Sequence, residues 1–389
     1  MTIDMALIFS KNNDGAPQTH AFIIGVGGYP FLLGGIHEQQ QVIEHIGLLK
    51  QLTSPPKSAL AFRDGLLAIE SDPNIHHNKP LGSIELLLSP SPDDPEPGIP
   101  GEVFEAATFN NISAAYNDWK KRCDSHEDNV AIFFFCGHGV EKMDHFLLAE
   151  DFGDNPNNPW QKSINFNMTR SGFHSCKANT QCFFVDACRQ ITGEMLSSVV
   201  LGNALDTPNL LTTPCLNDLT TEAAAKTKAA HGPKRKPSYF TQALLKALNG
   251  VVADNKGRHG WSVTTGDLAV HIQTVMGIVK PGQDHVGRCP SFLKTPVDLI
   301  RFDNPPLVAL SIACNPENAT PLANLSCKDL NTFNTQTRNP NGMASWEIDV
   351  ISGIHELTAE FQNSEFQPCR RHENITPLDN FKELKCLPL

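Results

Sequence analysis

The sequence predicts an α/β fold, with a mostly parallel sheet flanked by helices and a small β-sandwich-like domain after it. Up to about residue 300, short apolar runs alternate with stretches of helical spacing, which is typical of a buried parallel sheet with right-handed crossovers. Two of these runs end in reactive side chains. After Phe302 the pattern changes to short alternating runs between Asn, Pro and Gly clusters. We therefore expect one domain at 15–302 and a second at 303–389.

The first half of the chain supplies most of the expected sheet. An apolar run that enters a Gly pair, a run of strand length and the most apolar run of the chain predict strands, and two segments have helical spacing. The strands are expected at 21–26, 83–88 and 130–135, and the helices at 56–69 and 112–123. Ser113 is the expected cap of the second helix. Residues 89–101 are rich in Pro, Asp and Glu and predict an exposed loop.

The second half continues the alternation and then changes character. A strand is expected at 181–185 and a helix at 238–248, with a short apolar run at 146–149. Between them, residues 202–237 are crowded with Thr, Asn, Ala and Lys, and we expect a mobile surface loop there. The runs at 307–313, 346–351 and 356–361 predict a small antiparallel domain.

Composition excludes several classes of partner. The 389 residues are 40% hydrophobic and carry a net charge of −11, which disfavours nucleic acid or an anionic membrane as partner, because phosphate binding needs clustered Lys and Arg. Lys234-Arg235-Lys236 forms a short basic run. We expect neither a targeting segment in 1–9 nor a transmembrane run. Eleven cysteines, an odd number spread along the chain, indicate a reducing, cytoplasmic setting.

The expected chemistry lies just beyond two strands. One apolar run ends in Cys136-Gly137-His138-Gly139, and another ends in Asp186-Ala187-Cys188-Arg189. Active sites of parallel sheets are found at the carboxyl ends of the strands, where neighbouring strands bring their last residues together. A histidine beside a cysteine favours the nucleophilic thiolate and can protonate a leaving amine. His138 and Cys188 are therefore the candidate catalytic pair of a cysteine hydrolase.

Small residues beside this pair suggest where an oxyanion would bind. Gly137 and Gly139 permit tight turns and allow an amide to point inward. The backbone amides of Gly139 and Cys188 are the candidate donors to a tetrahedral intermediate.

These motifs resemble those of the caspase-like cysteine proteases, peptidase family C14, including the bacterial caspase-like and metacaspase-related proteins. The Ala-Cys-Arg core and the 50-residue separation of His138 from Cys188 carry the resemblance. It extends to residues 21–29, which look like the first strand and turn of such domains, and to residues 238–245, which look like a late helix. It covers roughly residues 15 to 300. It implies a cysteine endopeptidase with protein or peptide substrates, and a role in bacterial stress or defence circuits.

The resemblance also bears on specificity. Caspases that cleave after aspartate have Gln at the position of Asp186, whereas metacaspases have Asp there and accept Arg or Lys. A carboxylate in the pocket attracts a cation, so Asp186 predicts cleavage after Arg or Lys. Two departures oppose a simple transfer. Ser58 stands where metacaspases carry a second pocket acid, and Gln190 replaces the usual Gly after Arg189. Arg189 itself is expected in a structural ion pair, and Cys136 in the core.

Metal binding is the competing interpretation of some of these residues. Cys123 and His126 with Cys136 and His138 look loosely like paired zinc ligands, but the second pair is spaced too tightly for a usual structural site. Some metacaspases need calcium, for which Asp151 and Asp154 are candidate ligands, although such loops are usually only solvated. We expect no resident cofactor and no structural metal, and keep calcium activation as an alternative.

Two further expectations concern regulation and the rival function. Caspase-like proteases are often activated by a cut after the nucleophile segment, and Lys234, Arg235 and Lys236 lie in that interval. An enzyme with Asp186 in its pocket could cut itself there, although a solvated charge run is the alternative. Activation by a partner protein is a further expectation. The rival function is a catalytically silent scaffold that binds partner proteins through its C-terminal β domain.

Overall fold

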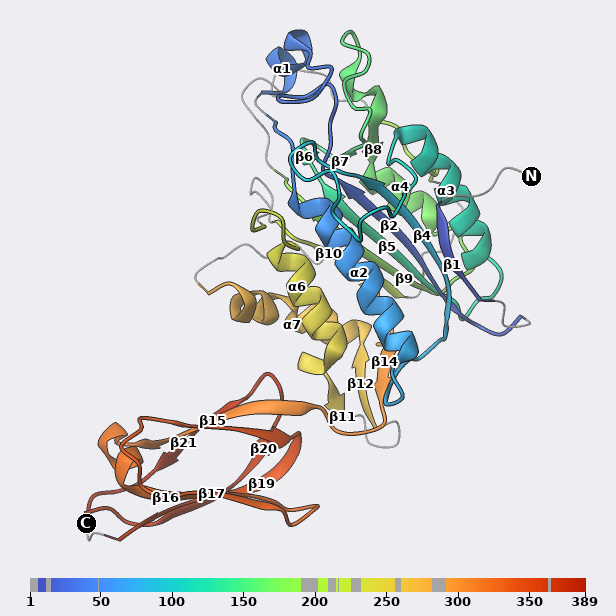
Figure 1. Ribbon diagram of the computed structural model, residues 1–389. Helices are drawn as coiled ribbons and strands as arrows, with labels where there is room; N and C mark the ends of the chain where they lie inside the picture. Colours follow the sequence, from blue (N-terminus) through green and yellow to red (C-terminus); the bar gives the residue numbers. More distant parts are fainter. Residues whose placement is uncertain are drawn as a thin grey trace. The chain divides into compact units, whose positions relative to one another are not determined.

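The computed structural model describes residues 6–11, 15–47, 49–189, 202–208, 215, 217–224, 232–255, 260–281, 292–362 and 365–389. The chain divides into two compact units (Figure 1). The first unit comprises Met1–Lys246 and Thr264–Ile300, and the second comprises Ala247–Val263 and Arg301–Leu389. The expected boundary after Phe302 stays a prediction.

A seven-stranded sheet forms the centre of the first unit, in the order β1-β4-β2-β5-β9-β10-β13. The strands are β1 (Leu7–Ser10), β2 (Thr19–Val26), β4 (Leu81–Ser89), β5 (Val130–Gly137), β9 (Thr180–Ala187), β10 (Asn217–Glu222) and β13 (Phe292–Leu293). The five central strands pair in parallel, and β1 and β13 pair antiparallel at the two edges. The mostly parallel sheet expected from the sequence is confirmed.

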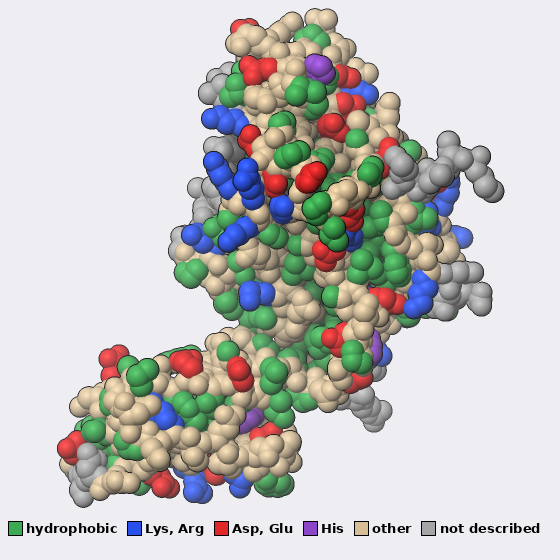
Figure 2. Space-filling view, in the orientation of Figure 1, with side chains coloured by type: hydrophobic (Ala, Val, Ile, Leu, Met, Phe, Trp, Pro, Cys, Tyr) green, Lys and Arg blue, Asp and Glu red, His purple; other side chains and the backbone are tan. Residues whose placement is uncertain are grey.

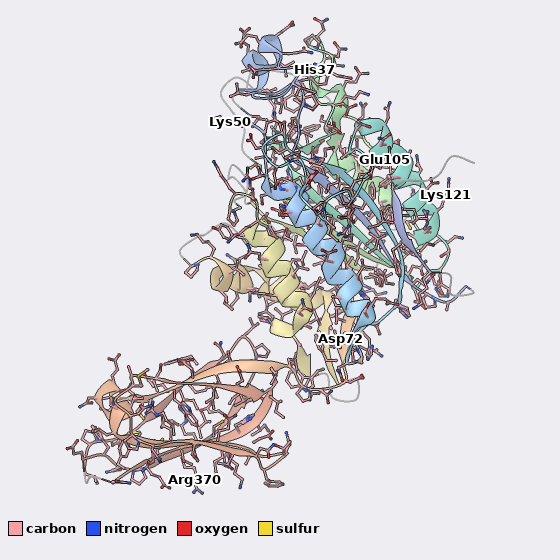
Figure 3. All side chains as sticks on the ribbon, in the orientation of Figure 1. His37, Lys50, Asp72, Glu105, Lys121 and Arg370 are labelled. Atoms are coloured by element: carbon pink, nitrogen blue, oxygen red, sulfur yellow. The ribbon has the colours of Figure 1, made fainter. Side chains whose placement is uncertain are left out.

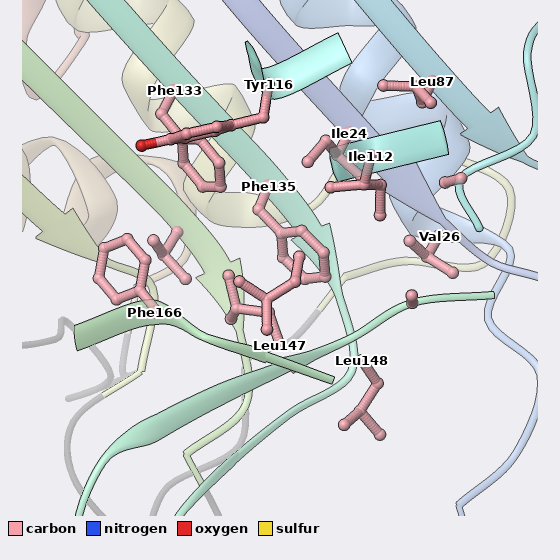
Figure 4. Packing of buried hydrophobic residues seen from close by; sticks show 14 of the residues in the cluster. Ile24, Val26, Leu87, Ile112, Tyr116, Phe133, Phe135, Leu147, Leu148 and Phe166 are labelled. Carbon is pink, nitrogen blue, oxygen red and sulfur yellow. The ribbon is translucent and has the colours of Figure 1, made fainter. Parts of the chain in front are cut away.

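The central strands are buried on both faces, which explains their nearly continuous apolar sequences. Successive side chains of β5 point to opposite faces. Phe134 stacks on Phe62 of α2 (Ser54–Ser71) with ring centroids 4.6 Å apart. The Phe133 ring centroid lies 6.4 Å from that of Trp119 of α3 (Phe109–Cys123). Figure 4 shows Tyr116 of α3 close to Phe133 in the buried cluster. Helices on both faces therefore seal the strand that leads to His138.

The helices of the first unit are α1 (Gln40–Ile46), α2 (Ser54–Ser71), α3 (Phe109–Cys123), α4 (Phe166–Phe173), α6 (Tyr239–Lys246) and α7 (Thr265–Val279), with the short helix η1 (Pro159–Lys162). The expected cap of α3 is wrong. The helix begins four residues before Ser113, and the Thr108 side chain accepts the N–H of Asn111 at 3.3 Å. Both Ser113 and Thr108 are good caps by residue type, so helix geometry decides between them.

The mobile loop expected at 202–237 is also wrong in part, because it contains β10, a buried strand of the central sheet. The sequence NDLTTE does not indicate a buried strand, because its charged side chains lie inside the protein. Asp218 is paired with Arg170 and His174, and Glu222 with Arg189. Ion-paired carboxylates can be buried, and Thr favours strands, so this strand has no apolar periodicity to detect.

A small antiparallel sheet follows His138 directly. Its strands are β6 (Gly139–Glu141), β7 (His145–Leu148) and β8 (Ser163–Asn165). Four other short strands are β3 (Ile75–His77), β11 (Asp254–Asn255), β12 (Trp261–Thr264) and β14 (Asp298–Phe302), and η2 (Ala247–Val251) follows α6. The β6–β7 hairpin places Glu141 opposite His145.

The second unit contains two sheets around one apolar core, which agrees with the expected small β-sandwich. One sheet has the order β18-β15-β21 and the other β17-β16-β19-β20. The strands are β15 (Leu307–Asn315), β16 (Ala323–Asp329), β17 (Thr335–Arg338), β18 (Trp346–Ile351), β19 (Gly353–Phe361), β20 (Cys369–Ile375) and β21 (Phe381–Lys385), with the short helix η4 (Glu317–Leu322). Leu310 of β15, Leu325 of β16 and Leu357 of β19 share the core. The pairing is antiparallel except between β15 and β21.

Within the described residues, no helix combines the length and the apolar character needed to cross a membrane.

Candidate active site

The register of two neighbouring strands brings the candidate pair together. In the parallel pairing of β5 with β9, Gly137 lies opposite Ala187, the last residue pair of the ladder. His138 directly follows Gly137 in the sequence, and Cys188 directly follows Ala187. The two side chains expected to act together therefore leave adjacent strands at the same, carboxyl edge of the sheet.

Both residues line a cavity of about 1110 Å³. Its lining includes Lys50, His138, Asp186, Cys188, Lys234 and Arg235. In Figure 2, Lys and Arg side chains gather along one margin of the first unit, in the region where Figure 3 labels Lys50. The cavity thus combines a buried acid with several basic side chains.

His138 is held by contacts on two sides. Its Nε2 lies 2.6 Å from the backbone oxygen of Lys50, and its backbone N–H donates to the Tyr29 hydroxyl at 2.8 Å. The Tyr29 ring packs 4.8 Å from the imidazole. Burial lowers the pKa of His138 to about 4, and the Lys50 carbonyl opposes this shift only in part. At neutral pH the ring is therefore uncharged and able to accept a proton.

Cys188 is half-buried, and its thiol is not in a disulfide. Its backbone oxygen lies 3.1 Å from Nε2 of His145. Gly139 packs against this same oxygen, since a Cβ on Gly139 would lie 2.6 Å from it. A Cβ on Gly137 would lie 2.8 Å from the Tyr29 hydroxyl. Neither glycine has a positive φ, so close approach and not turn geometry requires them, which corrects the expectation.

Asp186 lies at the base of the cavity, almost completely buried. Among the described residues its donors all reach Oδ2: the hydroxyls of Ser238 and of Thr241 (2.9 Å) and the thiol of Cys136 (3.3 Å). Burial raises the pKa of Asp186, and the three hydrogen bonds oppose that shift. Oδ1 receives no hydrogen bond from the described residues.

Ser58 belongs to the same group of side chains. It is fully buried on α2 and its hydroxyl accepts the backbone N–H of Ser238 at 2.9 Å. Cys136 is buried beside Asp186, as expected for a core residue, and burial together with that carboxylate raises the pKa of its thiol. The position of the missing second acid therefore contains a neutral, internally bonded serine.

Arg189 points away from solvent into a buried ion-pair network. Its Nε donates to Glu141 at 2.7 Å and its Nη1 to Glu222, and the other oxygen of Glu222 lies 3.2 Å from Nδ1 of His145. Glu141, His145 and Glu222 were not identified from the sequence. The available signal was one titratable residue at one end of each short strand, at the end of β6 and of β10 and at the start of β7, which is ordinarily a sign of exposure. Gln190 lies outside the described residues.

The basic run lies against the cavity. Lys234 and Arg235 line it, and Lys236 continues the same turn, with its N–H donating to the oxygen of Pro233 at 3.3 Å. Arg235 donates its backbone N–H to the Thr53 hydroxyl at 3.0 Å, and its Nη2 donates to the backbone oxygen of Asp93 at 2.8 Å. We call residues 232–238 the strap. Its backbone and side-chain bonds hold it at the rim of the site.

The paired zinc ligands considered above are not brought together. Cys123 and His126 precede β5, whereas Cys136 and His138 lie at its far end, so the strand separates the pairs by roughly 20 Å. Asp151 is engaged by the N–H of Phe109 at 2.8 Å and by Lys162 at 3.4 Å. Among the described residues, no cluster of three or more His, Cys, Asp or Glu side chains is arranged to hold a metal.

Comparison with known proteins is consistent with this geometry. Residues 95–282 match the family model of the caspase domain, peptidase family C14, and the match includes both His138 and Cys188. An uncharacterized protein of Sinorhizobium fredii is 26% identical over 264 residues, which are 64% of this chain and 74% of that protein. A probable protease of a Desulfuromonadales bacterium is 28% identical over 204 residues, which are 50% of this chain and 23% of that protein. Residues 95–282 of the chain are thus similar to the caspase domain of peptidase family C14.

Proposed function

We propose that this protein is a cysteine endopeptidase in which His138 and Cys188 form the catalytic dyad. The observation that carries the proposal is the pairing of Gly137 with Ala187, after which the two residues enter one cavity. The caspase domain at residues 95–282 supports the same chemistry.

The hydrogen bond to Lys50 determines which ring nitrogen of His138 exchanges a proton with the nucleophile and the leaving amine. A carbonyl oxygen only accepts, so Nε2 carries a proton and Nδ1 has a lone pair for catalysis. Cys188 Sγ attacks the substrate carbonyl carbon as its proton passes to Nδ1. The amides of Gly139 and Cys188 stabilise the oxyanion. The carbon–nitrogen bond then breaks and the amine leaves with the proton from His138.

The second half of the reaction regenerates the enzyme. Water attacks the thioester carbonyl while His138 accepts one of its protons, and the same amides hold the new oxyanion. The carbon–sulfur bond breaks, the acid product leaves, and the sulfur recovers its proton from His138. The Lys50 carbonyl takes the orienting role that a third carboxylate has in other hydrolases.

Asp186 is the proposed determinant of cleavage after Arg or Lys. Asp186 is 3% exposed and lines the cavity, and a charge-assisted hydrogen bond between a buried carboxylate and a substrate cation is strong. Ser58 is neutral, so of these two positions only Asp186 can supply a negative charge to bind the substrate cation.

Self-cleavage in the 202–237 segment is the proposed activation step. The strap carries Lys234, Arg235 and Lys236, of which the first two line the cavity that contains Asp186. A cut there would release basic side chains from the rim, leaving more room and a more negative cavity for a substrate cation. Calcium activation and an activating partner remain part of this proposal only as conditions to be varied.

The test is a panel of fluorogenic peptides with Arg, Lys or Asp before the reporter amine, assayed with and without calcium. We expect the wild-type protein to cleave the Arg and Lys peptides and the Cys188→Ala variant to cleave neither. A folded wild-type protein that turns over none of them under every condition would instead favour the silent scaffold.

A further inference from the structure

A buried group of four side chains lies beneath the backbone of Cys188. His145 of β7 is 1% exposed and directs Nε2 at the Cys188 oxygen, 3.1 Å away. Its other nitrogen faces Glu222, which also pairs with Arg189. Glu141 completes the group by pairing with the other side of the Arg189 guanidinium.

The contact has a defined direction. The Cys188 carbonyl can only accept, so His145 Nε2 is the donor. Glu222 accepts from Arg189, and its other oxygen lies 3.2 Å from Nδ1 of the same imidazole. The ring is only 1% exposed, so the surrounding side chains confine it. A group held in this way has little freedom to rotate away from Cys188.

Gly139 provides an independent sign that this contact is built into the site. A Cβ at this position would lie 2.6 Å from the Cys188 oxygen and 2.7 Å from His145 Nε2. Real Cβ atoms do not approach other atoms so closely, so any larger residue would have to separate the two. The chain thus has its smallest residue at the point where the imidazole meets the carbonyl.

The topology explains why these residues meet. The β6–β7 hairpin starts at Gly139, immediately after the proposed base, and places Glu141 opposite His145. Glu222 ends β10, which pairs with β9 beside it. The hairpin that follows His138 therefore contacts the peptide that follows Cys188.

We propose that His145 is a positioning residue for the nucleophile. By holding the Cys188 carbonyl it sets the backbone rotation at Cys188, and with it the direction of the thiol and of the amide proposed as oxyanion donor. The paired Arg189 anchors the next residue. This inference rests on the proposed function, but His145 touches neither the substrate nor the reacting atoms.

The test compares His145→Gln with His145→Leu. Gln can direct an amide N–H at the Cys188 carbonyl, whereas Leu has similar volume and no donor. The Leu variant is expected to lose on the order of 10²-fold in kcat, the size of effect that a small misplacement of a reacting group produces, with KM changed by less than about threefold. The Gln variant is expected to stay within about tenfold of wild type. Thermal melts of both establish that they are folded.

A purely structural role predicts a different result. It would lower the melting temperature of both variants and leave kcat unchanged at temperatures where they are folded. Equal kcat for His145→Leu and wild type, or a Gln variant as impaired as the Leu variant, overturns the proposal. Should the Leu variant not fold, His145→Asn replaces it, because its shorter amide reaches toward Glu222 and not toward Cys188.

A second readout does not depend on peptidase activity. Iodoacetamide labels Cys188, the label is located by mass spectrometry, and Cys188→Ala is the blank. The rate of labelling across pH is expected to fall in His145→Leu and to be restored in His145→Gln. If wild type labels in this manner but cleaves no peptide, the proposed function fails while the positioning role stands; if all variants label alike, the positioning role fails.

Discussion

His138 Nε2 lies 2.6 Å from the backbone oxygen of Lys50. This bond turns the imidazole so that one nitrogen is occupied by the protein and the other is available to the cavity. The residue that orients the proposed base is thus a piece of backbone 88 positions earlier in the chain, which no side-chain motif could indicate.

The pKa of His138 predicts the acid side of the activity profile. Burial lowers this pKa to about 4, so the imidazole remains an uncharged base as the pH falls below 6.5 and becomes protonated only near pH 4. Plots of kcat/KM against pH are expected to show an acid limb well below 6.5. An acid limb near pH 6.5, the ordinary histidine value, would show that burial does not lower the pKa of His138 in the free enzyme.

Replacement of Asp186 by Asn predicts a change in specificity with little change in fold. The amide oxygen can still accept from Ser238 and Thr241, while the charge is lost. We expect kcat/KM for Arg and Lys peptides to fall by roughly 10 to 10²-fold, the value of one charge-assisted hydrogen bond. Peptides with an uncharged residue at that position serve as the control. Equal losses on charged and uncharged peptides would argue against a role in specificity.

The strap predicts a defined self-cleavage product. Wild-type protein is expected to be cut after Lys234, Arg235 or Lys236 during incubation, since the first two line the cavity. Intact mass spectrometry locates the cut. Cys188→Ala and a variant with Gln at all three positions should stay whole. Wild-type protein that remains uncut for days, as the Cys188→Ala control does, removes the self-cleavage hypothesis.

His20 predicts a loss of stability in acid. Its side chain is buried on β2 with Nδ1 3.0 Å from the Ser83 hydroxyl of β4, and burial with the nearby Arg122 charge lowers its pKa to about 4. Between about pH 6.5 and 4 the unfolded chain binds a proton that the folded chain does not, so stability is complete above 6.5 and falls as pH decreases through this window. The titration of His20 lowers the free energy of unfolding by about 3 kcal/mol across this window.

The measurement for His20 is urea unfolding at pH 7 and pH 4.5, followed by circular dichroism. Other groups also titrate in this window, so the informative quantity is the difference between wild type and His20→Asn. The variant is expected to lose less stability than wild type on acidification. Parallel losses in the two proteins would show that His20 does not titrate as its burial requires.

Most of the sheet could be predicted from the sequence, because apolar runs mark its central strands. β5 and β9 are continuous apolar runs, and a parallel strand buried on both faces needs such a run. β10 could not be recognised in this way. Its Asp218 and Glu222 are buried against Arg170, Arg189 and histidine side chains that lie far away in the sequence.

By itself, the sequence determined the residue types, their places just beyond two strands, and the separation that resembles caspases. Periodicity and composition are local properties, so these inferences needed no knowledge of neighbours. The tertiary structure alone decided that Gly137 pairs with Ala187, that Lys50 faces His138, and that His145 holds the Cys188 carbonyl. Each is a contact between distant segments, set by strand register and by the partners that buried polar groups must find.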